Sequence, residues 1–163
     1  MIVRRARPTD AGAIRDIWNP VIRDTTITFT TEEKSAEGIA ADIAARGECF
    51  VVAEADGAVA GFATCFAFRS GPGYVRTREH SIQIAPSQRG RGLGRALMGR
   101  LESAAVAQDV HSLIAAISGS NAGAVAFHAR IGFVEVGRIR QAGFKSGVWL
   151  DLVLMQKILA PGA

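Results

Sequence analysis

Residues 88–95 read Gln88-Arg89-Gly90-Arg91-Gly92-Leu93-Gly94-Arg95, and this stretch decides how the rest of the chain is interpreted. An apolar run at 81–85 precedes it and predicts a strand that ends at Pro86. Apolar residues with helical spacing follow it: Leu93, Leu97, Met98, Leu101, Ala104 and Ala105. The predicted order is therefore strand, glycine-rich turn, helix.

The chemistry of this turn favours an anionic ligand. Its glycines are Gly90, Gly92 and Gly94, and its arginines are Arg89, Arg91 and Arg95. Glycine lets the backbone approach a ligand closely, because no Cβ stands in the way. The free N–H groups of the first helical turn and the positive end of the helix dipole attract anions. We expect the turn to hold a phosphate-bearing ligand.

Two common phosphate motifs do not fit this spacing. A mononucleotide P-loop needs Lys followed by Ser or Thr after its last glycine, whereas Arg95 and Ala96 follow Gly94. A dinucleotide fingerprint needs glycines two and three apart near the first strand, and these glycines are two and two apart and far from it. A glycine-rich turn that merely caps a helix stays open as an alternative.

Composition indicates an ordinary globular protein. With 163 residues, 48% hydrophobic and 21% charged, residues 1–163 are expected to form a single domain with its own core. No apolar run approaches membrane-spanning length and the N-terminus lacks the apolar core of a signal peptide, so we expect a soluble, cytoplasmic protein with no membrane partner. Cys49 and Cys65 lie in apolar surroundings and are expected to be buried, with no metal site.

The net charge of +4 raises nucleic acid as a partner, but the sequence favours a small polyanion. The 19 basic and 15 acidic residues are spread along the chain, without a lysine-rich tail. The densest basic clusters are the glycine turn and residues 74–78. Coenzyme A explains them as well as a phosphate backbone does, so we expect no nucleic-acid partner.

The periodicity predicts a mixed α/β chain in the order β-α-α-β-β-β-α-β-α-β-β. Strands are predicted at 2–7, 49–54, 58–68, 79–85, 112–118, 133–139 and 148–158. The first helix is expected to start with Thr9 as N-cap and to end or kink near Asn19, because Pro20 follows. Further helices are predicted after Ser35, after the glycine turn, and from Asn121 to about residue 131. Residues 24–31 are either a surface connection or a wall of a substrate pocket.

The pattern Arg89-x-x-Gly92-x-Gly94 resembles the pyrophosphate loop of the GNAT superfamily of acyl-CoA-dependent N-acetyltransferases, and the element order agrees over nearly the whole chain. The resemblance implies a GNAT fold, with a central mixed, mostly antiparallel sheet of about seven strands flanked by about four helices. It also implies acetyl-CoA as cosubstrate. The implied cofactor-binding residues are Ile82 and Ile84 through their backbone, Arg89, Gly90, Arg91, Gly92, Leu93, Gly94, Arg95 and Asn121.

Four segments are similar to a narrower group, the phosphinothricin and methionine sulfoximine acetyltransferases. They are Glu79-His80-Ser81, Arg89-Gly90-Arg91-Gly92, Gly143-Phe144-Lys145 and Trp149-Leu150-Asp151-Leu152. This resemblance implies acetylation of the amine of a small amino-acid-like molecule, by direct attack in a ternary complex, in a homodimer. It implies that Glu79 is the catalytic base; the alternative is a structural ion pair with Arg76 or Arg78.

The remaining expected site residues also follow from the resemblance. His128 stands where many GNAT enzymes carry a tyrosine acid for the departing thiolate, so it is the second catalytic candidate. Arg76, Arg78 and Lys145 are the expected substrate-binding residues. The narrower group often has an aromatic-arginine pair where this chain has Tyr74-Val75, and the nearest arginine here, Arg76, lies one residue later. Peptide acetylation and non-catalytic acyl-CoA binding stay open as alternatives.

Overall fold

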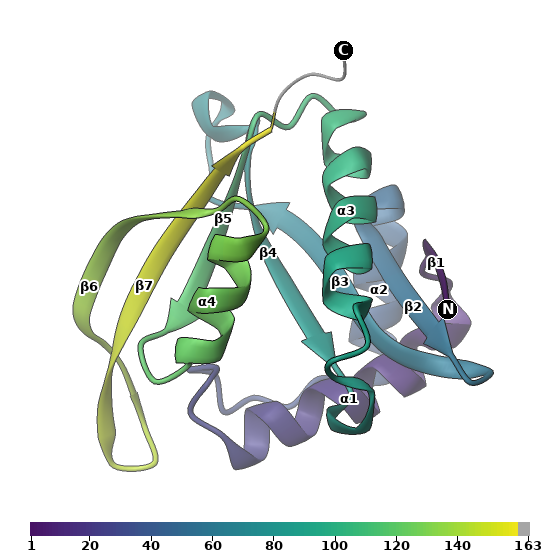
Figure 1. The fold of residues 1–163 in the computed structure, drawn as a ribbon, viewed down its shortest axis with the longest axis horizontal. Helices are drawn as coiled ribbons and strands as arrows, with labels where there is room; N and C mark the ends of the chain where they lie inside the picture. The colour runs from purple at the N-terminus through teal and green to yellow at the C-terminus, as the bar shows by residue number, and fades with distance from the viewer. Residues whose placement is uncertain (160–163) are drawn as a thin grey trace.

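The computed structural model describes residues 1–159, which form one seven-stranded sheet with four α-helices (Figure 1). The strands are β1 (Ile2–Arg5), β2 (Phe50–Ala55), β3 (Ala58–Ala67), β4 (Thr77–Ile84), β5 (Ser112–Ser118), β6 (Val134–Lys145) and β7 (Val148–Ile158). The helices are α1 (Ala11–Asp24), α2 (Ala36–Arg46), α3 (Leu93–Val106) and α4 (Ala122–Arg130). The strand order is β1-β2-β3-β4-β5-β7-β6, and β4 with β5 is the parallel pair in an otherwise antiparallel sheet. The predicted element order and sheet type are confirmed.

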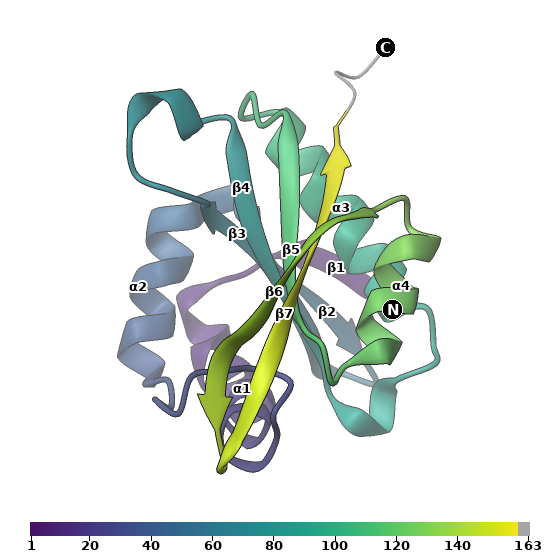
Figure 2. The same ribbon diagram turned by 90° about the vertical axis from the view of Figure 1, so that its left-hand side faces the viewer.

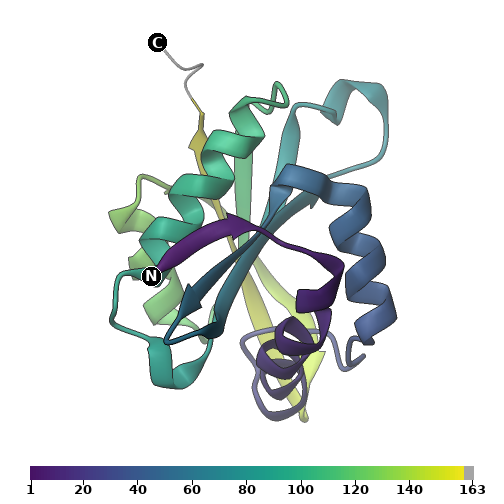
Figure 3. The same ribbon diagram turned by 90° about the vertical axis from the view of Figure 1, so that its right-hand side faces the viewer.

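The helices cover both faces of the sheet. Helices α1 and α2 lie on one face, and α3 and α4 lie on the other (Figures 2 and 3). Side chains of β2 contribute alternately to the hydrophobic cores on the two faces of the sheet, because successive residues of a strand point to opposite faces. Phe50 and Val52 pack with Ile14, Ile39 and Ile43 of α1 and α2.

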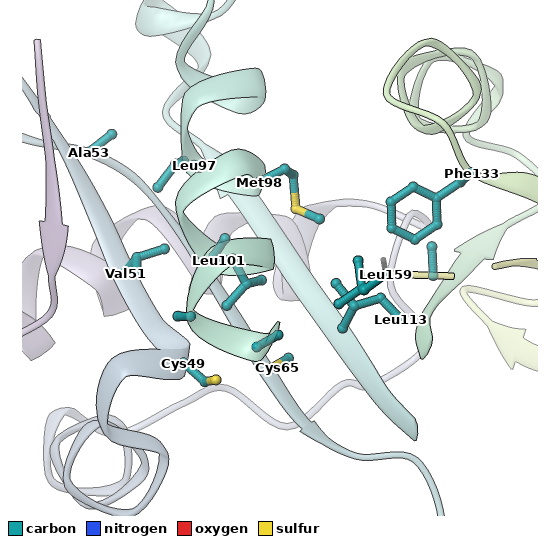
Figure 4. Close-up of a cluster of buried hydrophobic side chains, with 14 of the residues drawn as sticks. Cys49, Val51, Ala53, Cys65, Leu97, Met98, Leu101, Leu113, Phe133 and Leu159 are labelled. Atoms are coloured by element: carbon teal, nitrogen blue, oxygen red, sulfur yellow. The ribbon is translucent and has the colours of Figure 1, made fainter. Parts of the chain in front are cut away.

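The core on the α3 face is the larger of the two (Figure 4). Val51 of β2 and Leu113 of β5 meet Leu97 and Leu101 of α3 there. Cys49 and Cys65 are also buried in this cluster, as expected from their apolar surroundings.

The feature of the fold that matters most for function is the divergence of β4 from β5. The two strands pair in parallel only from Thr77 opposite Ser112 to His80 opposite Ala115. Beyond these pairs the strands separate, as Figure 1 shows. The facing edges of residues 81–84 and 116–118 are left without a strand partner across the gap. Backbone N–H and C=O groups on such edges are available to a ligand.

The first helix differs from the prediction at its start, and it does not end at Asn19. Helix α1 continues through Pro20 to Asp24, because Val21 and Ile22 beyond the proline are buried in the protein interior. Thr9 is not its N-cap: residues 8–10 form a short 3-10 turn and α1 begins after Asp10. The Asp10 carboxylate accepts a hydrogen bond from the backbone N–H of Arg7 and pairs with Arg4 at 2.8 Å.

Strand β6 is longer than the predicted 133–139 and runs to Lys145. Its pairing with β7 shifts register between Ile139 and Gly143, where Gln141 has a positive φ of 52°. The N–H of Gln141 donates to Oδ1 of Asp151 at 2.9 Å, so a side chain supports the irregular segment. A bulge of this kind breaks the alternation from which a strand is recognised in a sequence.

Candidate active site

Two adjoining cavities lie at the divergence of β4 and β5. The larger has a volume of about 740 Å³ and the smaller about 390 Å³. Both are lined by Ile27, Thr28, Thr30, His80, Ser81 and Ala116. For residues 24–31, the sequence left a surface connection and a pocket wall open. Ile27, Thr28 and Thr30 of this segment line both cavities, so it forms a pocket wall.

Glu79 lines the larger cavity and is half-buried. It lies on β4 opposite Phe66 of β3, on the sheet face that α1 and α2 cover. Burial raises the pKa of its carboxyl group. Within residues 1–159, no salt bridge joins Glu79 to Arg76, Arg78 or any other cation. Its carboxylate is thus open to the cavity and more basic than an exposed one.

His128 of α4 forms a buried pair with His80 of β4. The two side chains are 4% and 6% exposed, and their Nε2 atoms are 2.9 Å apart. Nδ1 of His128 lies 2.7 Å from the carbonyl oxygen of Ala124, which can only accept, so this nitrogen carries a proton and donates it. In the neutral pair, Nε2 of His128 must then accept from Nε2–H of His80. Nδ1 of His80 is buried without a hydrogen-bond partner in the described chain.

The environment keeps this pair neutral at physiological pH. Burial, reinforced by the neighbouring His128, lowers the pKa of His80 to about 3. Burial also lowers the pKa of His128. Phe133 meets the His128 ring edge-on, with centroids 5.2 Å apart, so the surroundings are apolar. Sequence reasoning missed His80, because its contact with His128 joins two elements that are 48 residues apart.

The glycine turn has the conformation expected for an anion site. Gly90 and Gly92 have φ values of 76° and 81°, which side chains other than glycine rarely adopt. Gly92 is the N-cap of α3 and provides no capping side chain, so N–H groups of the first helical turn stay uncapped. Gly94 is closely packed: a Cβ there would lie 3.1 Å from Phe127 and 3.3 Å from Ile84.

The other residues of the turn divide into two kinds. Leu93 is buried in the core on the α3 face. The Arg91 guanidinium pairs with Asp56 at 2.8 Å, which neutralises part of its charge. Arg89 and Arg95 form no salt bridge in the described residues, so their charges remain for a ligand.

The smaller cavity brings Ile82 and Asn121 together with His128. The Asn121 side chain accepts a hydrogen bond from the backbone N–H of Ala124 at 3.1 Å, so it caps α4. Ile82 and Ile84 pack their side chains against the α3-face core, which leaves their backbone edge toward the gap.

The three expected substrate-binding residues lie outside both cavity linings. Arg76 is exposed, and its carbonyl oxygen accepts from the N–H groups of His111 and Ser112. Arg78 points to the opposite face of β4 from Glu79, by the alternation of the strand. The Lys145 ammonium donates to two backbone carbonyl oxygens and is buried.

The cation that does line the larger cavity is Arg69, with Tyr74 beside it in the lining. Arg69 follows the end of β3, is exposed, and forms no salt bridge within the described chain. Sequence reasoning missed it, because Arg69 lies two residues beyond Ala67, the last residue of β3, where strand alternation no longer gives the direction of a side chain. The larger cavity thus carries a carboxylate and a guanidinium.

Two further observations concern other kinds of site. In the part of the chain that the structure describes, no helix is long and apolar enough to cross a membrane. The same residues contain no group of three His, Cys, Asp or Glu side chains placed to hold a metal ion.

Comparison with known proteins identifies the family. Residues 14–133 match the family model described as the acetyltransferase (GNAT) family. The chain is 35% identical over 159 residues to the Escherichia coli (strain K12) L-amino acid N-acyltransferase MnaT, covering 96% of this chain and 92% of that protein. It is 34% identical to the Salmonella typhimurium L-methionine sulfoximine/L-methionine sulfone acetyltransferase, over 96% of this chain and 93% of that one.

A solved structure agrees with these relatives. The chain superimposes with a TM-score of 0.91 on a GNAT superfamily phosphinothricin acetyltransferase from Sinorhizobium meliloti in complex with AcCoA, at 32% identity, covering 99% of this chain and 89% of that one. The chain therefore belongs to the GNAT acetyltransferase family and is an acyltransferase with the GNAT fold. Its relatives are named for small amino-acid analogues.

Proposed function

We propose that this protein transfers the acetyl group of acetyl-CoA to the primary amine of a small amino-acid-like molecule, by direct attack in a ternary complex. The observation that carries the proposal is the larger cavity, which combines the open carboxylate of Glu79 with the unpaired guanidinium of Arg69 at the divergence of β4 and β5. A zwitterion presents an ammonium and a carboxylate, which are complementary to these two groups.

The cofactor fits the other side of the divergence. The uncapped N–H groups at the start of α3, with Arg89 and Arg95, are suited to a pyrophosphate. The unpaired edge of β4 at Ile82 and Ile84 can accept a pantetheine arm as an extra strand. Asn121, in the smaller cavity, is placed to contact that arm. The bound acetyl-CoA supplies the activated acyl group.

On the amine side, Glu79 acts as the base. An ammonium must lose a proton before its nitrogen can attack, and a carboxylate whose pKa is raised by burial takes that proton more readily. Arg69 holds the substrate carboxylate in place of Arg76 and Arg78, because it lines the cavity and they do not.

His128 borders the smaller cavity beside the position proposed for the thioester. In the neutral pair its Nε2 carries no proton and accepts from His80, so the proton that the departing thiolate gains is the one that the attacking nitrogen loses as the amide forms. No covalent enzyme intermediate is needed. Cys49 and Cys65 are buried in the core and contribute to neither cavity lining.

We also propose that the protein is a homodimer through the outer surface of β6 and β7. The exposed apolar residues here include Val136, Phe144 and Trp149, and the Phe144 and Trp149 rings pair at 4.9 Å. Apolar side chains gathered on an edge strand favour association. Sedimentation equilibrium of the wild type and of Trp149→Glu tests the proposed homodimer. A monomeric wild type would contradict it.

Thiol release from acetyl-CoA with a panel of amines tests the function. The panel holds methionine sulfone, methionine sulfoximine, phosphinothricin, ordinary amino acids, polyamines and peptides with free N-termini. Turnover confined to zwitterions supports the proposal. Preferred turnover of peptides would support a peptide N-acetyltransferase, and binding of acetyl-CoA without turnover of any amine would support a non-catalytic acyl-CoA-binding protein.

A further inference from the structure

Lys145 is a buried lysine at the end of β6, and its side chain reaches back to the N-terminal part of the chain. It is 5% exposed, and no salt bridge joins it to a carboxylate in residues 1–159. Its Nζ donates to the carbonyl oxygen of Ile22 at 2.6 Å and to that of Thr28 at 2.9 Å. One ammonium therefore joins two points that lie 123 and 117 residues away in sequence.

These two carbonyl groups belong to backbone that has few other partners. Ile22 lies in the last turn of α1, where carbonyl groups have no partner within the helix and a cation is favourable. Thr28 lies in the middle of residues 25–31, a stretch with no helix or strand. Within the described chain, no backbone–backbone hydrogen bond outside the regular elements involves that stretch.

The hairpin of β6 and β7, which carries Lys145, also holds residues 25–31 by packing. Gly143 lies two residues before Lys145 and faces the same side of β6. A Cβ at Gly143 would lie only 2.4 Å from the Phe29 ring, so Phe29 lies directly against the glycine backbone. Ser120 makes the third attachment, since its hydroxyl lies 3.4 Å from that of Thr26.

Residues 25–31, which these contacts attach to the hairpin, form the wall that both cavities share. Ile27, Thr28 and Thr30 line both of them, and Phe29 lines the larger. Lys145 lines neither. We propose that Lys145 is a positioning residue: its ammonium fixes the backbone of 25–31 at Thr28 and thereby sets the shape of the cavity that receives the amine. The role in catalysis rests on the proposed function, whereas the attachment does not.

The test compares Lys145→Met with Lys157→Met. Lys157 is a matched control, because its Nζ also makes two bonds, to the Ile131 carbonyl oxygen and to Glu102, each at 2.8 Å. It lines neither cavity. ¹⁵N relaxation of the unliganded protein measures the backbone order parameters of 25–31, which should fall from about 0.85 to below about 0.6 in Lys145→Met only.

Kinetics give the second readout. In Lys145→Met the KM for the amine should rise about tenfold, while the dissociation constant of acetyl-CoA stays within about twofold of wild type. Unchanged order parameters in 25–31, or the same change in both variants, would overturn the inference. If Lys145→Met does not fold, Lys145→Gln, which keeps N–H donors on a shorter side chain, is measured in the same way.

The two proposals fail in different ways. If no amine is acetylated, the proposed function is wrong, and the order parameters still decide whether Lys145 holds the stretch. If zwitterions are acetylated and Lys145→Met changes neither mobility nor KM, the function stands and the positioning role is wrong.

Discussion

At the scale of single residues, Glu79 is a carboxylate whose environment suits a base. It is half-buried, and burial raises its pKa. Glu79→Gln keeps the shape and removes the basicity, so kcat should fall by about 10²- to 10⁴-fold while acetyl-CoA binding is retained. In the wild type, kcat/KM should fall as the pH drops through a pKa above the ordinary glutamate value of about 4.3. A variant with wild-type turnover across the pH range would remove Glu79 from the mechanism.

Arg69 should determine which amines are accepted. Arg69→Gln removes the guanidinium from the larger cavity, so the KM for a zwitterionic amino acid should rise at least about tenfold, as expected for loss of a charge-assisted contact. The carboxamide of the same amino acid should be unaffected. Arg76→Gln is the matched control, because Arg76 is exposed and outside both linings. Equal losses in both variants would contradict the assignment.

The buried histidine pair should make stability depend on pH. Both histidines have pKa values lowered in the folded protein, so below about pH 6.5 the unfolded chain binds protons that the folded protein does not. The free energy of unfolding should therefore fall as the pH drops below about 6.5. His80→Phe should reduce that slope by about 1.4 kcal/mol per pH unit, measured by urea unfolding at several pH values. The exposed His111→Asn is the control, and equal slopes in wild type and His80→Phe would contradict the lowered pKa of the buried His80.

At the scale of elements, the turn before α3 combines backbone conformation with charge. Gly92 has a φ of 81°, and nothing lies within 4 Å of where its Cβ would be, so conformation rather than space excludes other residues. Gly92→Val should weaken acetyl-CoA binding at least about tenfold through left-handed strain. Calorimetric titration measures the affinity for acetyl-CoA. Gly99→Ala in the middle of α3 is the control, because a Cβ at that position also has nothing within 4 Å. Wild-type affinity in Gly92→Val would contradict the cofactor assignment.

The elements also show what a sequence can predict. The turn at 88–95 was predictable because its residues act together locally, and the order of helices and strands along the chain followed from periodicity. The full length of β6 was not predictable, because it depends on pairing with β7 around the bulge at Gln141. The choice of Arg69 over Arg76 and Arg78 was not predictable either, because Arg69 and Arg76 lie in the loop between β3 and β4, where strand alternation does not give the direction of a side chain. The contact of His80 with His128 depends on packing between a strand and a helix.

At the scale of the whole molecule, the candidate site lies where two strands of the sheet separate, between the helix layers on its two faces (Figures 2 and 3). Strands β4 and β5 separate after His80 and Ala115 (Figure 1), and residues of both strands line the two cavities there. The wall at 25–31 comes from the chain before β2, and the hairpin of β6 and β7 holds it from the far end of the sheet. Segments distant in sequence therefore build the amine side, whereas one continuous turn builds most of the proposed pyrophosphate site.

The most direct measurement is acetylation of methionine sulfone by the purified protein with acetyl-CoA, followed by thiol release and by mass spectrometry of the product. We predict one N-acetyl group on the α-amine per thiol released, and loss of both signals in Glu79→Gln. Tight binding of acetyl-CoA with no thiol release for this or any other zwitterionic amine would contradict the proposed transfer to amino-acid-like amines.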